Sequence, residues 1–424
     1  MSPGSGSGDA PYDVIAIGAG PFNLGLAALA DGLDLRVAVL DGRPEFTWHR
    51  GLMFDDAMLQ VSFLADLVSL VEPAHRLSFL SYLRDNDRLY QFYVREKFHP
   101  TRREYEAYLR WCAGQLDSLH FGREVTEVEW DGSVFVLTVG GERMSARHLV
   151  LGVGTEPAVP AALAELPADR LLHSADYLYR RDELLRAGRV TVVGSGQSGA
   201  ECALDLLRAD APAVSWLTRT ASFAPLDYSK LVLEMTTPSY VDYFHALDEP
   251  VRDRLVKEQW RHYKGISSET LDQIHDLLYQ RDLGSAPVEL QCGVAVESSA
   301  VGADGVELTL RHTDTGRTFQ HSCDVVVAAT GYRNRPLGFL QSSVDSLVER
   351  DAAGRWAIKR DHSVEGALAG RLFVANADLH SHGVAAPDLG IGAVRNATIL
   401  NAVAGREVFR LPKSTAFTSF GLPA

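Results

Sequence analysis

The chain has 424 residues, with 41 lysine and arginine residues against 55 aspartate and glutamate residues, so its formal net charge is −14. This length predicts two or three domains, and an apolar fraction of 46% excludes a disordered or fibrous chain. The acidic balance argues against a nucleic-acid-binding protein, because phosphates are neutralised by a surplus of positive side chains on one face.

Four cysteines are scattered without a Cys-x-x-Cys spacing, which argues against a disulfide framework or a zinc site and fits a reducing compartment. The glycine- and serine-rich residues 1–8 lack the basic and apolar regions of a signal peptide, and they predict a flexible leader. No apolar run approaches the roughly 20 residues that cross a bilayer. We therefore expect a soluble, cytoplasmic protein with no membrane association.

The first ordered elements are expected from Tyr12 onward. Residues 13–17 form an apolar run rich in β-branched side chains, which predicts a buried parallel strand. A glycine turn, an apolar helix over 24–33 and a second strand over 35–40 follow. Together they make a βαβ unit of about 30 residues, which is typical of a dinucleotide-binding domain.

The glycine turn of this unit reads Gly18-x-Gly20-Pro21-x-Asn23. The first glycine permits the tight turn, and the second lets the backbone approach a pyrophosphate at the helix N-terminus. Asn23 replaces the usual third glycine, and we expect its amide near the phosphates. Asp41 ends the second strand, where a carboxylate accepts hydrogen bonds from ribose hydroxyls. The unit is therefore predicted to bind FAD.

The same pattern recurs further along the chain. A strand over 189–193 precedes a turn with all three glycines, a helix over 200–208 and a strand over 214–218. Arg219 closes this unit, and a cation there suits the 2′-phosphate of NADPH better than a carboxylate would. The residues predicted to hold NADPH are Gly194, Gly196, Gln197, Ser198, Gly199 and Arg219.

The duplication predicts an α/β fold with two doubly wound, Rossmann-like dinucleotide-binding domains and a small helical substrate region. We expect a discontinuous FAD domain over 12–158 and 329–424, interrupted after a proline-containing linker. The NADPH domain is expected over 159–328 and includes the helical substrate region at about 221–282. Two nucleotide domains imply hydride transfer from NADPH to a flavin.

Two further groups of side chains are candidates for the site. His380-x-His382 is the only tight histidine pair, but no third ligand is spaced nearby, so no metal is predicted. Trp48, His49 and Gln60 are predicted to line the flavin, with a structural role in the core as the alternative.

Several motifs, taken in order, resemble the flavin-dependent N-hydroxylating monooxygenases of siderophore biosynthesis, and the resemblance runs from Tyr12 to about Arg410. The matching segments are 18–24, 46–49, 59–67, 100–105, 194–199, 329–332 and 382–384. The resemblance implies an enzyme that uses FAD, NADPH and O₂ to hydroxylate a primary amine through a C4a-hydroperoxyflavin. It also implies a dimer or tetramer. The residues that it implies at the cofactors are Trp48, His49, Gln60 (also catalytic), Val125, Thr330, Gly331, Tyr332, Asp388 and Leu389.

The position of Ala65 bears on the substrate. Lysine and ornithine hydroxylases of the family carry Phe-Leu-Lys-Asp-Leu, and that lysine pairs with the substrate carboxylate. Here the segment is Phe63-Leu64-Ala65-Asp66-Leu67, so no ammonium is available there, and an unpaired buried carboxylate costs roughly 3–5 kcal/mol. This favours an aliphatic diamine, cadaverine or putrescine, unless another cation such as Arg102 or Lys264 compensates.

A diamine brings a second ammonium, which calls for a carboxylate. Glu234, Asp227 and Asp388 are the candidates, and the sequence does not rank them; His262 and Leu389 are further predicted substrate contacts. The alternatives are an L-lysine N6- or L-ornithine N5-monooxygenase of the same family. More distant alternatives are an NADPH-dependent flavin reductase and a nucleotide-binding protein without catalysis.

Overall fold

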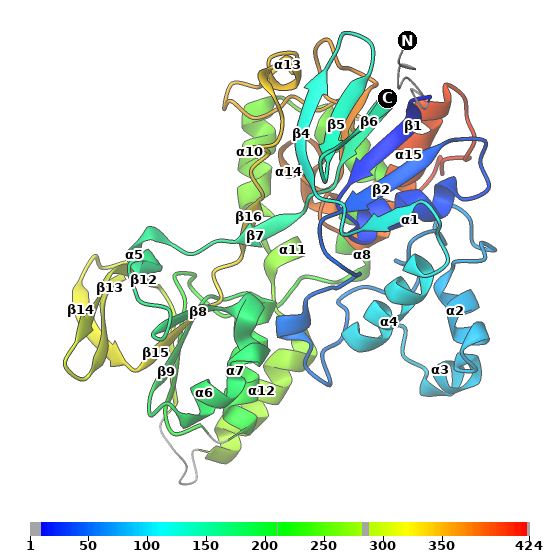
Figure 1. Ribbon diagram of the computed structural model, residues 1–424. Helices are drawn as coiled ribbons and strands as arrows, with labels where there is room; N and C mark the ends of the chain where they lie inside the picture. The colour runs from blue at the N-terminus through cyan, green and yellow to red at the C-terminus, as the bar shows by residue number, and fades with distance from the viewer. Residues whose placement is uncertain (1–9, 210, 282–287, 422–424) are drawn as a thin grey trace.

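The computed structural model describes residues 10–209, 211–281 and 288–421, so the predicted leader lies outside the described residues. Figure 1 shows two α/β units, with the short strands β7 (Thr155–Pro157) and β16 (Tyr332–Asn334) between them. These two strands pair antiparallel, so the crossing at Thr155–Pro157 and the crossing at Tyr332–Asn334 run side by side. In the part of the chain that the structure describes, no helix is long and apolar enough to cross a membrane.

The first unit is built on a seven-stranded sheet in the order β3-β2-β1-β6-β5-β4, with β17 beside β6. Strands β1, β2, β3 and β17 run parallel to their neighbours, while β4, β5 and β6 form an antiparallel meander. The bounds are β1 (Tyr12–Ile17), β2 (Val37–Asp41), β3 (Leu119–Phe121), β4 (Val125–Trp130), β5 (Phe135–Val139), β6 (Glu142–Leu151) and β17 (Leu372–Val374). The central strands are buried on both faces, as their continuous apolar runs predict.

Helices cover one face of this sheet, and a second apolar layer covers the other. The helix of the first βαβ unit packs against the last helix of the chain, and the interruption places these two elements more than 360 residues apart in sequence. The helices of this unit are α1 (Pro21–Ala30), α2 (Phe79–Asp85), α3 (Leu89–Arg95), α4 (Arg102–Ala113), α13 (Ser342–Asp345), α14 (Leu379–His382) and α15 (Gly392–Ala404).

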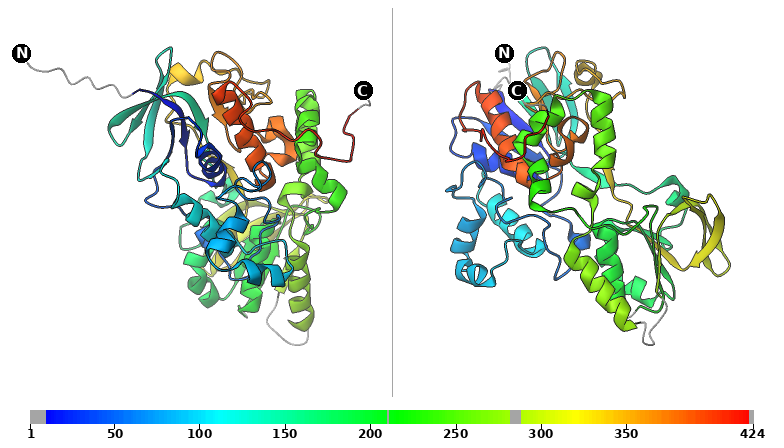
Figure 2. Two further views of the ribbon diagram at one scale, coloured as in Figure 1. Left: turned by 90° about the vertical axis from the view of Figure 1, so that its right-hand side faces the viewer. Right: turned by 180° about the vertical axis from the view of Figure 1, so that it is seen from behind.

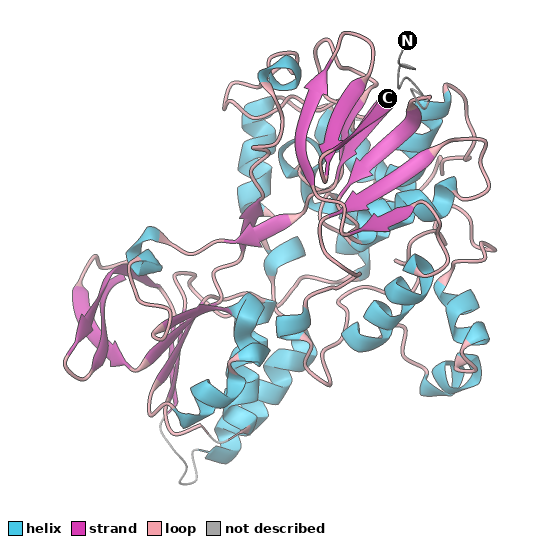
Figure 3. Cartoon of the chain, viewed as in Figure 1, coloured by secondary structure: helices cyan, strands magenta, loops and turns pink. Residues whose placement is uncertain are grey.

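The second unit contains a parallel five-stranded sheet in the order β11-β10-β9-β15-β8. Helices α7 and α12 pack together on one side, and a three-stranded antiparallel sheet covers the other (Figure 3). The strands are β8 (Leu171–His173), β9 (Val190–Val193), β10 (Val214–Leu217), β11 (Val288–Gln291), β12 (Val294–Gly302), β13 (Gly305–His312), β14 (Thr318–Cys323) and β15 (Val325–Ala328). The helices are α5 (Ala161–Ala164), α6 (Arg181–Arg186), α7 (Gln197–Arg208) and α12 (Ser268–Arg281). Two α/β units of the predicted class are thereby confirmed.

The helical region that the sequence assigns to the second domain divides between the two units. Helices α9 and α10 contact α14 of the first unit, and only α12 packs on α7 (Figure 2). The cause is an apolar contact in which Phe244 and Tyr240 of α9 are buried beside Val384. The helices of this segment are α8 (Lys230–Leu233), α9 (Pro238–His245), α10 (Glu249–Glu258) and α11 (Arg261–Lys264). Most of the predicted substrate region therefore rests on the first unit.

Candidate functional site

The first glycine turn has the backbone that a bound pyrophosphate requires. Gly18 has φ +91°, and a Cβ there would lie 2.4 Å from the carbonyl oxygen of Gly152, so only glycine fits. Gly20 is the N-cap of α1, and nothing lies within 4 Å of the space in front of it. Pro21 occupies the first turn of the helix, where its missing N–H costs nothing. The turn thus offers free backbone donors at a helix N-terminus to an anion.

Asn23 does not point toward this anion site, in contrast to the prediction from sequence. Its side chain is buried, and Nδ2 donates to the carbonyl oxygens of Ile17 and Gly18 at 3.0 and 2.8 Å. A Cβ at Gly152 would lie 2.3 Å from that amide. Asn23 therefore ties the start of α1 to the end of β1 and to the turn, because an amide can satisfy buried carbonyl groups that a third glycine would leave open.

Asp41 at the end of β2 is buried and already strongly hydrogen-bonded. One carboxylate oxygen accepts from Ala19 N–H at 2.7 Å, and both oxygens accept from Arg43. Burial opposes ionisation, but the hydrogen bonds from Arg43 and Ala19 outweigh it, so the pKa of Asp41 lies below its usual value. Asp41 thus fixes the glycine turn, and Arg43, which sequence reasoning missed, stands beside it at the expected ribose position.

The other residues predicted at the first nucleotide surround this turn. His49 adopts a left-handed backbone with φ +47°. The centre of its ring lies 4.7 Å from the ring centre of Trp48 and 6.5 Å from that of Tyr332. Val125 opens β4, two residues after Arg123, whose N–H donates to the carbonyl oxygen of Asp41. The structure therefore gathers these side chains around the junction of the two units.

The second glycine turn is equally constrained. Gly194 has φ +137°, and a Cβ there would lie 2.0 Å from the carbonyl oxygen of Ala329. A Cβ at Gly199 would lie 2.6 Å from the carbonyl oxygen of Gly194, so α7 approaches β9 as closely as the three-glycine pattern predicts. Gly196 is the N-cap of α7. This turn also presents backbone donors at a helix N-terminus.

Two cations stand near the second turn. The carbonyl oxygen of Lys264 would lie 3.6 Å from a Cβ at Gly196. Burial lowers the pKa of the Lys264 ammonium, and the nearby positive charge of Arg219 lowers it further. Two like charges held close together in an otherwise acidic chain fit a doubly charged anion such as a 2′-phosphate. The sequence identified Arg219 for this role but not Lys264.

A pair of glutamines joins Gln60 to the start of α7, directly after the second glycine turn. Gln60 Nε2 donates to Gln197 Oε1 at 3.3 Å, and the same Oε1 accepts from the N–H of Ser267 at 2.8 Å. Ser198 follows at the start of α7. Gln60 and Gln197 line a cleft of about 1280 Å³ between the units, together with Tyr228 and Thr270. The predicted catalytic residue Gln60 is thus positioned at the boundary that a hydride must cross.

The segment 329–332 forms the return crossing into the first unit. Thr330 Oγ1 donates to the carbonyl oxygen of Ala158 at 2.6 Å, and Gly331 accepts from the Nε2 of His173 at 2.9 Å. Gly331 has φ +83° with open space in front of it. The predicted residues Thr330, Gly331 and Tyr332 therefore hold the two crossings together beside His49.

Ala65 and Asp388 form the centre of a candidate substrate site. A Cβ at Gly390 would lie 2.9 Å from Asp388 Oδ1 and 4.0 Å from Ala65 Cβ, so the acid stands beside the alanine. Asp388 Oδ1 accepts from the N–H of Gly390 at 2.6 Å. Burial raises the pKa of Asp388, and among the described residues no lysine, arginine or histidine forms an ion pair with it.

Aromatic side chains enclose this acid. Burial raises the pKa of Tyr228 and Tyr105, and the carboxylate of Asp388 adds to both effects. Leu389 lies next to it and, with Pro21 and Tyr105, surrounds a small void in front of α1. Asp388 and Leu389 therefore connect the first nucleotide turn to the position of Ala65.

The other two candidate acids lie elsewhere. Both oxygens of Glu234 accept backbone N–H groups, from Phe417 at 2.9 Å and Thr418 at 2.8 Å, so this side chain holds the C-terminal segment. Asp227 accepts from the N–H and hydroxyl of Ser229.

The structure also shows the surroundings of His262, a predicted substrate contact, and of Arg102, a cation that could have compensated for the missing lysine. His262 on α11 is half-buried, burial lowers its pKa, and its Nδ1 has no hydrogen-bond partner among the described residues. Arg102 is not free to neutralise a substrate carboxylate, because it forms a bidentate ion pair with Glu201 at 2.7 Å.

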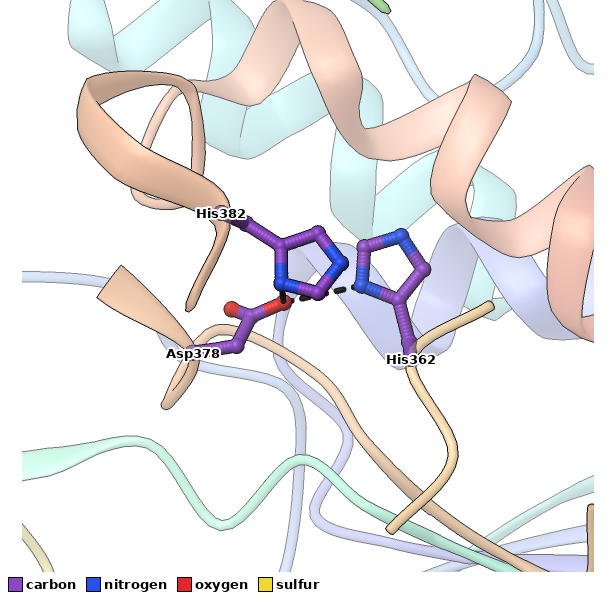
Figure 4. A group of neighbouring side chains, drawn as sticks. All are labelled: His362, Asp378 and His382. Atoms are coloured by element: carbon purple, nitrogen blue, oxygen red, sulfur yellow. Dashed lines mark hydrogen bonds and ion pairs between the residues drawn. The ribbon is translucent and has the colours of Figure 1, made fainter. Parts of the chain in front are cut away.

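His380 and His382, the tightly spaced histidines of the sequence, contact different partners in the structure. His380 Nε2 bonds the carbonyl oxygen of Trp356, whereas His382 stacks on His362 with 4.1 Å between ring centres. Figure 4 shows both rings turned toward Asp378, whose Oδ2 lies 2.8 Å from His362 Nδ1 and 3.4 Å from His382 Nδ1.

The other carboxylate oxygen of Asp378 lies close to a buried cation. The guanidinium of Arg395, itself buried, lies 3.5 Å from Asp378 Oδ1. Two histidines and an aspartate are suitable metal ligands. The positive charge of Arg395 beside the carboxylate of this cluster would, however, repel a metal ion bound there. We interpret the group as a buried ion pair with two neutral imidazoles.

Comparison with known proteins places this arrangement in a family. Residues 10–334 match the family model described as L-lysine 6-monooxygenase/L-ornithine 5-monooxygenase. A putrescine N-hydroxylase of Shewanella oneidensis is 40% identical over 422 residues, covering 96% of this chain and 84% of that protein. The rhizobactin siderophore biosynthesis protein RhbE of Rhizobium meliloti is 40% identical over 434 residues, covering 97% and 96%.

A solved structure agrees with these relatives. The FAD-bound cadaverine monooxygenase of the desferrioxamine pathway from Erwinia amylovora superposes with a TM-score of 0.94 at 36% identity, covering 98% of this chain and all of that one. The family model and the relatives confirm the resemblance inferred from the motifs. The chain therefore belongs to the L-lysine 6-monooxygenase/L-ornithine 5-monooxygenase family, whose members are flavin-dependent N-hydroxylating monooxygenases.

Proposed function

We propose that this protein is an FAD- and NADPH-dependent monooxygenase that hydroxylates one primary amine of an aliphatic diamine, cadaverine or putrescine, for hydroxamate siderophore biosynthesis. The observation that carries the choice of substrate is the buried, unpaired Asp388 beside Ala65. The relatives described as putrescine N-hydroxylase and cadaverine monooxygenase support the same substrate class.

The two glycine turns fit the two nucleotides. Gly18, Gly20 and Pro21 would hold the pyrophosphate of FAD at the N-terminus of α1, beside Asp41 and Arg43. Gly194, Gly196 and Gly199 would hold NADPH at α7, with Arg219 and Lys264 at the 2′-phosphate. When bound, the flavin supplies the redox chemistry that activates O₂ for transfer to nitrogen.

Charge at the substrate site favours a diamine over an amino acid. A diamine carries an ammonium at its far end, and Asp388 supplies a carboxyl group whose pKa burial raises and a bound ammonium would lower again. An amino acid would bring a carboxylate to a site with Ala65 in place of a lysine and with Asp388 repelling it. The ion pair is formed only when the substrate is bound, so it contributes directly to substrate binding.

The side chains around the site can prepare the other amine. That nitrogen must lose its proton before it reacts, and its ordinary pKa is about 10.4. Tyr105, Tyr228 and Leu389 form an apolar wall that disfavours the charged form by desolvation. Gln60 and Gln197, bonded across the units, would stand between the two bound nucleotides.

The domain boundaries, the location and the oligomeric state predicted from the sequence also form part of this proposal. The FAD domain comprises residues 12–158 and 329–424, and the NADPH domain comprises 159–328, except that α9 and α10 pack on the former. A cytoplasmic location and a dimer or tetramer complete the proposal.

Product formation with a set of amines tests the substrate. Purified holoenzyme is given NADPH and O₂ with cadaverine, putrescine, L-lysine or L-ornithine, and hydroxylamine is quantified against NADPH consumed. We expect coupled hydroxylation of a diamine and, with either amino acid, NADPH oxidation that ends mainly as peroxide. Coupled turnover of lysine or ornithine but not of the diamines would contradict the proposal, and peroxide with every amine would indicate a flavin reductase.

A further inference from the structure

A second cavity, of about 240 Å³, lies where β6 and β17 end, and it is distinct from the cleft between the units. It is lined by residues within the segments 151–154, 334–337, 355–358 and 374–377, together with His380. We call it the β17 cavity. None of the residues assigned above to FAD, NADPH or the amine lines it. The β17 cavity is therefore a separate candidate site for a ligand.

The β17 cavity lies on the face of the first sheet that is opposite α1. Leu151 and Val374, which line it, belong to the apolar layer on that face, whereas Leu24 of α1 packs in the layer on the other face. The glycine turn proposed for FAD is at the N-terminus of α1. A ligand in the β17 cavity and a bound FAD are thus held from different faces of the sheet.

The inner wall of the β17 cavity is apolar and packed. Leu151, Ile358 and Val374 are at most 4% exposed. The indole of Trp356 is fixed beside them, because its Nε1 donates to Asp345 at 3.2 Å and its carbonyl oxygen bonds His380 Nε2 at 2.9 Å. An engineered apolar cavity of about 150 Å³ holds benzene. The β17 cavity therefore has room for one aromatic ring with a short side chain.

The charged side chains among the described residues that line the β17 cavity are two arginines, and no carboxylate lines it. Arg355 is neutralised by ion pairs with Glu249, Asp253 and Asp351 at 2.6–3.2 Å. Arg335 is exposed, and its side chain forms no ion pair or hydrogen bond within the described part of the chain. In a chain with a net charge of −14, one uncompensated cation at an apolar cavity favours an anionic ligand.

Two side-chain amides add hydrogen-bonding groups to this cation. Asn334 and Asn376 both line the β17 cavity, and neither amide has a hydrogen-bond partner among the residues that the structure describes. Asn376 also has a left-handed backbone with φ +63°, which asparagine tolerates better than most residues. The backbone of Arg335 is fixed, because its N–H donates to the carbonyl oxygen of Gly154 at 3.2 Å. A guanidinium and two amides around one cavity are suitable donors for a carboxylate.

We propose that the β17 cavity binds a small organic carboxylate with an apolar body about the size of a phenyl ring. The carboxylate pairs with Arg335 and accepts hydrogen bonds from the two amides, while the apolar body packs on Ile358 and Trp356. A single uncompensated cation matches a monoanion better than a doubly charged phosphate, and it repels the ammonium of a diamine. The site is independent of the proposed function, because it shares no residue with the cofactor and amine sites.

Ligand binding to the FAD-loaded protein tests this site. Isothermal titration calorimetry is carried out with 3-phenylpropionate and with its neutral amide, each with and without saturating NADP⁺ and cadaverine. We expect 3-phenylpropionate to bind with a dissociation constant of roughly 1 mM or below, and the amide to bind at least about tenfold more weakly. NADP⁺ and cadaverine should leave both constants unchanged. Equal binding of acid and amide, displacement by NADP⁺ or cadaverine, or no binding of the acid up to about 10 mM would overturn the proposal.

Two variants locate the ligand. Arg335→Gln should raise the dissociation constant of 3-phenylpropionate about tenfold, and Ala377→Phe should abolish binding by filling the cavity. Arg333→Gln is the matched control, since Arg333 removes the same charge but pairs with Glu156 and does not line the cavity.

Unchanged FAD content and melting temperature establish that these variants are folded. Arg335 lies at the surface, so Arg335→Gln remains a valid test even where a ring at position 377 prevents folding. Wild-type affinity in Arg335→Gln or in folded Ala377→Phe, or an equal loss in Arg333→Gln, would show that the carboxylate binds elsewhere.

Discussion

At the scale of single residues, Asp388 is the side chain on which substrate choice depends. Asp388→Asn keeps the shape of the site and removes the charge that would face the distal ammonium. We expect a roughly 10²–10⁴-fold loss in kcat/KM for the diamine, in line with the roughly 3–5 kcal/mol lost when one partner of a buried ion pair is removed. Steady-state hydroxylamine formation measures this loss. NADPH oxidation without substrate should change little.

Glu234→Gln is the matched control for this variant, because its carboxylate binds the N–H groups of Phe417 and Thr418 and should barely affect kcat/KM. Equal losses in the two variants would show that Asp388 does not contact the substrate.

The sequence predicted some of these residues and could not have predicted others. Gly18 and Gly194 could be predicted because their positive φ and close backbone contacts allow no side chain. Glycine is therefore required at these positions, and its spacing in the sequence identifies the motif. The contacts of Glu234 could not be predicted, because its partners lie more than 180 residues away and the direction in which an exposed acid points leaves no local pattern. The pair of His362 with Asp378 also escaped prediction, because the two residues are 16 positions apart and belong to no recognisable motif.

At the scale of elements, helices α4 and α7 are joined across the two units by the ion pair of Arg102 and Glu201. The two side chains are 14% and 7% exposed, and Glu201 also accepts from Gln197, which bonds Gln60. We expect Arg102→Met to lower the free energy of unfolding by roughly 3–5 kcal/mol, because it leaves a buried carboxylate unpaired.

A second variant distinguishes this ion pair from general packing. Arg102→Met combined with Glu201→Met should recover part of the stability, since no charge is then stranded. Thermal or urea unfolding measures both variants, and stopped-flow reduction of the flavin by NADPH reports whether the units still meet. Equal stability of Arg102→Met and the wild type would show that the pair contributes nothing to holding the units together.

Sequence patterns were informative about elements whose contacts are local. Strands β1 and β9, with the glycine turns after them, follow from continuous apolar runs and short-range spacing. The docking of α9 on the first unit did not follow, because it depends on Phe244 meeting Gly383, where a Cβ would lie 2.9 Å from the ring. The apolar face of an amphipathic helix indicates that the helix packs against another element, but it does not identify that element.

At the scale of the whole molecule, the buried cluster of Asp378, His362, His382 and Arg395 connects acidity to stability. Burial lowers the pKa of both imidazoles, which favours their neutral forms in the folded protein. The ordinary pKa of histidine is about 6.5, so below that pH the unfolded chain binds protons that the folded chain does not. The stability that this difference provides is therefore fully present above about pH 6.5 and is lost as the pH falls.

The slope of this loss is measurable. Each such imidazole should make the free energy of unfolding fall as the pH decreases from 6 to 5, by up to about 1.4 kcal/mol per pH unit. His362→Gln should reduce the slope by about that amount, whereas His99→Gln, at an exposed position, should leave it unchanged. Urea titrations of the holoenzyme at pH 7, 6 and 5, followed by tryptophan fluorescence, give the slopes. If His362→Gln left the slope at its wild-type value, His362 would already be protonated in the folded protein. The cluster, which includes Arg395, would then carry a net positive charge.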